Sequence, residues 1–133
     1  MKKTLISIFL FLSIFSISLY SYKLILNSFN EIIKQCDELE KNFYSVNFKE
    51  TPENINLIYS QTLVLSDDIN HIYNKLAFFL SHETLDLLKS DVSALIQYIK
   101  SDELGECLRF LNSIKSTSET IINLEKITLE NIF

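Results

Sequence analysis

An uncharged run near the N-terminus restricts this chain more than any other feature. Nineteen residues from Thr4 to Tyr22 carry no charge, and most of them are Leu, Ile, Phe or Ser. At about 1.5 Å of rise per helical residue the run spans about 28 Å, close to the roughly 30 Å hydrocarbon core of a bilayer. We therefore predict a transmembrane anchor over residues 1–23, followed by one acidic helical domain over residues 24–133.

A cleaved secretory signal peptide is the alternative, because it also has a basic start and an apolar run. Here the run exceeds the usual length of about 7–15 residues, and its best small-x-small cleavage site, Ser16–Ser18, lies inside it. The apolar pattern also continues past Lys23 to Phe29. The sequence favours a retained anchor.

The flanking lysines bear on the orientation of the anchor. Lys2 and Lys3 favour a cytoplasmic N-terminus, whereas Lys23, Lys34 and Lys41 lie on the other flank, so the count is nearly even. We expect a single-pass protein of the cell membrane, with the N-terminus inside and the C-terminal domain extracytoplasmic.

The composition favours helices over strands. Gly105 is the only glycine and Pro52 the only proline, whereas a β-rich domain of this size needs many tight turns. Apolar residues instead recur at helical spacing in four stretches. The first extends the anchor as a stalk to about Ser45. Thr51 is a candidate N-cap for the second, and Asp102 for the fourth.

Each stretch predicts one apolar stripe along a helix, which we call a seam. We also predict a turn or kink at residues 81–83 and a slip in the phase of the apolar spacing at residues 116–118. The seam residues are Ile25, Phe29, Ile32, Cys36, Leu39, Phe43 and Val46; Ile55, Ile58, Thr62, Leu65, Ile69, Ile72, Leu76 and Phe79; Leu85, Leu88, Val92, Leu95 and Ile99; and Leu104, Leu108, Leu111, Ile114, Ile121, Ile122, Leu124 and Leu129. We predict an all-α fold: a transmembrane helix continues into a stalk and packs in an antiparallel bundle of three to four helices. Tandem helix hairpins are the alternative.

The charge distribution argues against nucleic-acid binding. From Lys23 onward there are ten bases and seventeen acids, a net charge of −7, and Arg109 is the only arginine. Phosphate contacts need clustered Lys and Arg, so neither nucleic acid nor anionic headgroups beyond the anchor are expected ligands.

The two cysteines, Cys36 and Cys107, are too few and too far apart in sequence for a disulfide framework or a Cys-based metal site. A single disulfide between them is the alternative, and it requires their helices to pack side by side in an oxidising compartment. Burial as core thiols is favoured.

One motif resembles a metal site. His82, Glu83 and Asp86 form H-E-x-x-D, similar to the H-E-x-x-H of zinc proteases, but the second histidine is replaced. Zinc needs at least three placed protein ligands, so we favour a role for the acids at a helix start.

A second polar group, Asp67, Asp68 and His71, lies on one helical face and is more typical of a solvated surface than of a cation site. No phosphate loop or nucleophile elbow is present. We predict no catalytic, cofactor-binding or metal residues, no cofactor and no enzymatic activity.

Three further stretches resemble an uncharacterised family of short membrane-anchored proteins of spore-forming Firmicutes, domain of unknown function 4363. They are the S-H-E-x-x-D stretch at Ser81–Asp86, I-K-S-D-E-L at Ile99–Leu104, and the ending L-E-K-I-T-L-E-N-I-F at Leu124–Phe133, beside the M-K-K start. The resemblance implies a location and a shape but brings no activity and no site residues.

The expected function is a non-enzymatic, membrane-anchored helical module that binds another membrane or envelope protein, or a second copy of itself. Serines on one face of the anchor, among them Ser18 and Ser21, would permit close helix approach, although serine is common throughout the chain. The alternative function is a sensor or carrier of a small ligand or lipid, with a pocket in the bundle.

Overall fold

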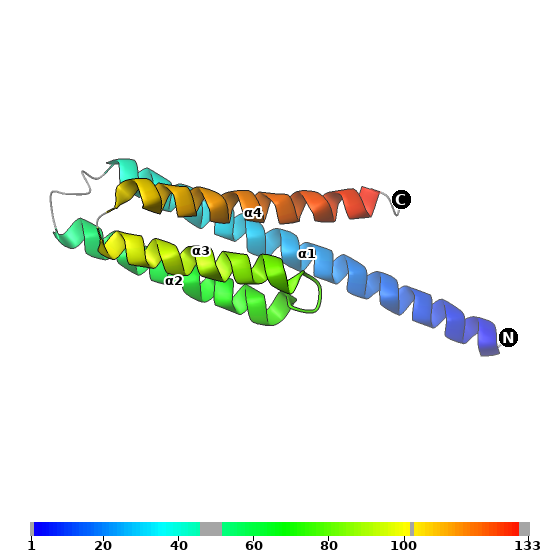
Figure 1. Ribbon diagram of the computed structural model, residues 1–133. Helices are drawn as coiled ribbons and strands as arrows, with labels where there is room; N and C mark the ends of the chain where they lie inside the picture. The colour runs from blue at the N-terminus through cyan, green and yellow to red at the C-terminus, as the bar shows by residue number, and fades with distance from the viewer. Residues whose placement is uncertain (1, 46–51, 102, 131–133) are drawn as a thin grey trace.

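The computed structural model describes residues 2–45, 52–101 and 103–130, which form four α-helices (Figure 1). These are α1 (Lys2–Ser45), α2 (Pro52–Leu76), α3 (His82–Lys100) and α4 (Leu104–Glu130). No strand occurs in the described ranges. The all-α prediction is confirmed, and the stalk ends at the predicted residue. The predicted N-caps Thr51 and Asp102, and Val46 of the first seam, lie outside the described residues.

The helices form a ring in which each one packs against the two that adjoin it, with α4 closing the ring on α1. Successive helices run in opposite directions (Figure 1). The diagonal pairs, α1 with α3 and α2 with α4, make no close backbone contact among the described residues. This is an up-down-up-down four-helix bundle, and the stalk supplies its fourth helix as predicted.

The core is built from the predicted seams. Five α3 seam residues and six α1 seam residues are buried, and the buried apolar side chains form a single cluster that runs through all four helices. Its largest fully buried members are Phe29 and Phe43 of α1. Burial at a spacing of three and four residues is the reason that each stretch is helical, because only a helix turns these positions toward one interior.

The seam of α4 corrects one prediction. No slip of phase occurs at residues 116–118, because α4 is continuous and Ser118 itself occupies a buried seam position after Cys107, Leu111 and Ile114. The Ser118 hydroxyl donates to the Ile114 carbonyl oxygen at 2.8 Å, which satisfies the polar group inside the core. Thr62 of α2 is buried in the same way, with its hydroxyl 2.8 Å from the Ile58 carbonyl oxygen.

Side-chain hydrogen bonds define the register between α1 and α2. Asn42 Nδ2 donates to Gln61 Oε1 at 2.9 Å, and Gln35 Nε2 donates to Asp68 Oδ2 at 2.6 Å. The two bonds lie seven residues apart on both helices, as antiparallel helices require.

Two further contacts define the register of α4. Lys115 of α4 forms an ion pair with Asp37 of α1. On the other side of α4, the Ser113 hydroxyl donates to Asp91 Oδ2 of α3 at 2.6 Å, and Asp91 is the one buried acid of the described residues. Each contact bridges two neighbouring helices of the ring.

The N-terminal half of α1 projects beyond the bundle (Figure 1). Its large apolar side chains face solvent, as in Leu5 at 64% and Phe9 at 71% exposure, whereas Ile25 is only 1% exposed. Within Thr4–Tyr44 this helix is long and apolar enough to cross a membrane, by length and composition. Such a helix fits a membrane anchor or a signal sequence.

Candidate functional site at the α1-exit end

We call the end of the bundle at which the projecting half of α1 emerges the α1-exit end. The turn between α2 and α3, residues 77–81, and the C-terminal part of α4 lie at this end (Figure 1). The turn is a short continuation of α2, with the amide nitrogens of Phe79 and Leu80 2.9 and 3.0 Å from the Leu76 carbonyl oxygen. The chain then enters α3 at His82.

Two residues expected in seams are exposed at this end. Phe79 is 45% exposed and Leu124 is 59% exposed, although their spacing continues the seams of α2 and α4. Phe79 lies in the turn, three residues beyond the end of α2 at Leu76. Both predictions of burial were wrong, and both residues instead border a pocket.

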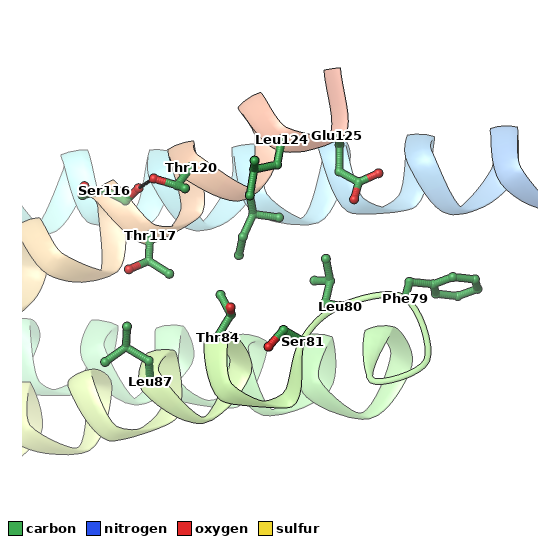
Figure 2. Close-up of a pocket in the computed structure, with 11 residues that line it drawn as sticks. Phe79, Leu80, Ser81, Thr84, Leu87, Ser116, Thr117, Thr120, Leu124 and Glu125 are labelled. Carbon is green, nitrogen blue, oxygen red and sulfur yellow. Dashed lines mark hydrogen bonds between the residues drawn. The ribbon is translucent and has the colours of Figure 1, made fainter. Parts of the chain in front are cut away.

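The pocket has a volume of about 450 Å³ and lies between the turn, the start of α3 and the second half of α4 (Figure 2). Leu80, Leu87, Ile121 and Leu124 supply its apolar lining. Its polar lining consists of Ser81, Thr84, Ser116, Thr117, Thr120 and Glu125. The lining thus mixes apolar walls with several hydroxyls and one carboxyl, and a pocket with convergent polar groups is a candidate small-ligand site.

Glu125 is the one ionisable side chain among the described lining residues. Partial burial disfavours its charged form and so raises the pKa of the carboxyl above the usual range of a glutamate. The neighbouring Thr120 hydroxyl is bonded at 2.8 Å to the Ser116 carbonyl oxygen of its own helix (Figure 2). The pocket therefore offers one weakly acidic group and several hydroxyls, which suit binding better than proton transfer between two groups.

The H-E-x-x-D motif lies at the start of α3, where two of its side chains contact α2. The His82 ring lies 6.2 Å from the Tyr73 ring, and the Lys89 ammonium lies 4.4 Å from the centroid of the same ring. The negative charge of Asp86, together with partial burial and a hydrogen bond to Asp86, raises the pKa of Tyr73. The motif thus helps to pack α3 against α2.

The second polar group is divided between two roles. Asp68 accepts the bond from Gln35 described above, whereas Asp67 and His71 are exposed. Within the described ranges, no three His, Cys, Asp or Glu side chains gather as metal ligands would. The predicted absence of metal and catalytic residues stays a prediction.

The two cysteines are buried thiols at different levels of the bundle. The Lys115–Asp37 pair gives the register of α4 against α1. Cys107 lies eight residues before Lys115 and therefore opposite Ser45, eight residues after Asp37. Cys36 lies nine residues before Ser45, or about 13 Å along the axis. A disulfide needs Cα atoms within about 7 Å, so this fold does not bridge them. Burial, and to a smaller extent the charge of Asp37, raises the pKa of the Cys36 thiol to about 12.

Sequence reasoning raised a pocket in the bundle only as an alternative and did not locate it, although one signal for its position was present. Residues 116–118 and Thr120 carry only small hydroxyl-bearing side chains, where a helix packed along its whole length would carry a large apolar residue on the face toward α3. We interpreted this stretch as a slip of phase. It is instead the place where α4 leaves space beside α3 (Figure 2).

A family model, domain of unknown function (DUF4363), matches residues 19–132, which cover the bundle and the end of the projecting segment. The chain matches no curated protein and no solved structure.

Proposed function

Because the chain belongs to the family of domain of unknown function 4363, which brings no assigned activity, we propose a function from the geometry. The protein is a non-enzymatic helical module, anchored in the cell membrane by α1 with its bundle on the extracytoplasmic side, and it binds a membrane or envelope protein. The observation that carries this proposal is the continuity of α1, whose first half is apolar and exposed and whose second half is a wall of the bundle.

The energetics of α1 support membrane anchoring. Leu10 and Ile14, at 55% and 67% exposure, belong to a run of large apolar side chains that stay mostly exposed beside the described helices. Each buried apolar side chain of this size gains about 1.5–3 kcal/mol on leaving water, and a bilayer covers the whole run at once.

The outer face of α2 supports a protein partner. Leu57 and Val64 are 50% and 56% exposed and lie two helical turns apart, so they face the same side. A partner helix could pack on this stripe, and a second copy of the chain is the simplest such partner.

Protease accessibility tests the location. In intact cells, a C-terminally tagged full chain should remain full length, fractionate with membranes, and be digested by external protease. The control variant carries Leu10→Lys and Ile14→Lys, which leave the core untouched and should release the protein from membranes. A shorter, soluble wild-type product would identify a signal peptide, and protection from protease would reverse the orientation.

Photo-crosslinking tests the partner. A photoreactive residue at Val64 should capture a membrane or envelope protein, or a second copy, whereas the same residue at the exposed Ser93 of α3 should not. Equal capture from both positions, or none from Val64, would argue against binding through α2.

The pocket favours a second candidate, a sensor or carrier of an apolar ligand with one polar end. A volume of about 450 Å³ lies within the range of about 300–1,000 Å³ of small-ligand pockets. Thermal unfolding with added fatty acids should show stabilisation of the wild-type chain that Thr117→Leu, which fills the pocket, removes. No stabilisation by any chain length would dismiss this candidate.

A further inference from the structure

Four large apolar side chains are exposed at the α1-exit end of the bundle. Phe78 is 95% exposed, and Phe79, Leu124 and Ile127 are 45%, 59% and 54% exposed. We call these four residues the apolar tip. Phe79 and Leu124 both border the pocket, and Figure 2 shows the Phe79 ring directed away from it, toward the outside of the bundle. Scattered exposed apolar residues are ordinary, but a group at one end of a bundle marks a contact surface.

The helix register places this tip at the end of the uncharged run. From the Gln35–Asp68 bond, eight residues along each helix bring Leu76, the last residue of α2, opposite Asn27, and Phe78 follows two residues later in the turn, near the level of Ile25. From the Lys115–Asp37 pair, twelve residues along each helix bring Ile127 opposite Ile25 as well. Two independent contacts therefore assign Phe78 and Ile127 to one level.

That level corresponds to the headgroup region of a bilayer that holds the anchor. Ile25 lies three residues beyond Tyr22, or about 4.5 Å along α1. The polar region on each side of the hydrocarbon core is about 5–8 Å thick, and apolar faces of interfacial helices settle at this boundary. Phe78 and Ile127 would reach the lipid without any change in the bundle.

The charged side chains near the tip fit the same environment. Lys23, Lys75 and Lys126 are all exposed, and the register places them within one and a half turns of the Ile25 level. Lysines at this depth extend their charge toward phosphate oxygens while their stems lie along apolar surface. Two acids lie near the same level: Glu125 is half-buried in the pocket, and Glu83, at the start of α3, is exposed, so the three lysines outnumber them. The contact is therefore local, and the acidic surface of the rest of the bundle does not oppose it.

We infer that the apolar tip inserts into the headgroup region of the bilayer that anchors α1, so that the bundle rests on the membrane at a second point. This inference rests on the proposed membrane anchoring. A bilayer is the occupant that the structure favours, because α1 holds the tip at the lipid surface at all times. The inference holds for either orientation of the anchor.

The chain has no tryptophan, so one substitution creates a unique reporter. The full-length Phe78→Trp variant is reconstituted into phosphatidylcholine vesicles that contain lipids brominated near the headgroup. The matched control is Tyr44→Trp, an aromatic position that is 70% exposed but lies at the opposite end of the bundle. Ile127→Trp is a second reporter at the tip. Circular dichroism checks that each variant is folded.

We expect bromolipids to quench Phe78→Trp and Ile127→Trp at least twofold more than Tyr44→Trp. Equal quenching of the three variants, in protein that floats with the vesicles, would overturn the inference without contradicting the membrane anchoring. Failure to float would refute the anchor itself. Unquenched, blue-shifted emission that depends on protein concentration would assign the tip to a second copy and also overturn the inference.

Discussion

The division of α1 into an exposed half and a core half can be tested with one substitution made twice. Phe9 and Phe29 lie in the same helix, but Phe9 is 71% exposed and Phe29 is 0% exposed. Truncation of a fully buried phenylalanine to alanine removes its transfer free energy and leaves a cavity, at a cost of about 3–5 kcal/mol. Phe9→Ala removes no contact with the bundle and should change its free energy of unfolding by less than about 0.5 kcal/mol.

The expected loss is large for a domain of this size. Small domains are stable by about 5–15 kcal/mol, so Phe29→Ala should remove a third or more of the total in the lower part of that range. For about 100 residues, 1 kcal/mol corresponds to about 4 °C, so we expect Tm to fall by about 12–20 °C.

The assay is urea unfolding of the full chain in detergent micelles, followed by circular dichroism, with the projecting half of α1 in the micelle in every sample. The midpoint should fall for Phe29→Ala without a change in slope, and stay constant for Phe9→Ala. A loss below about 1 kcal/mol for Phe29→Ala, or equal losses for the two variants, would refute the assignment of α1 to the core.

Three further predictions follow from single side chains. Because burial raises the folded pKa of Cys36 to about 12, above the ordinary thiol value of 9.0, the folded state retains the proton and stability should fall by up to about 1.4 kcal/mol per pH unit above pH 9. Urea titrations should show a flatter profile for Cys36→Ala, and identical profiles would contradict the assignment. Gln35→Glu places a second carboxylate beside Asp68, so unfolding at pH 7 should require about 1–3 kcal/mol less, with recovery near pH 4 where the pair can share a proton; an unchanged midpoint at pH 7 would argue against the bond. Gly105 lies in the first turn of α4, where an added Cβ would meet no atom within 4 Å, so Gly105→Ala should stabilise the bundle by about 0.5–1 kcal/mol in the same assay, and a loss would refute this.

Most of the architecture could be predicted because burial leaves a periodic trace in the sequence. Every buried residue of α3 apart from Asp91 was a predicted seam position, and the chain offered too little glycine and proline for another fold class. Apolar periodicity states which face of a helix is inside. It does not indicate how far the adjacent helix extends, and for that reason the exposure of Phe79 and Leu124 was not predicted.

The candidate site could not be derived in the same way. Ser118 is a polar residue, yet it belongs to the core because its hydroxyl bonds to the carbonyl oxygen one turn earlier. Thr117 lies one residue before it and lines the pocket. A small hydroxyl-bearing residue therefore lies inside the core or beside a cavity according to the position of the neighbouring helix.

The helices, the uncharged run and the faces that pack together follow from the amino-acid sequence, because helical periodicity and hydrophobicity are local properties of a chain. The remaining features arise from tertiary packing. It closed α4 against α1, left a pocket between the turn and the second half of α4, and brought Phe78 and Ile127, far apart in sequence, to the level of Ile25. These outcomes depend on the lengths and register of several helices at once, and no single segment of the chain contains them.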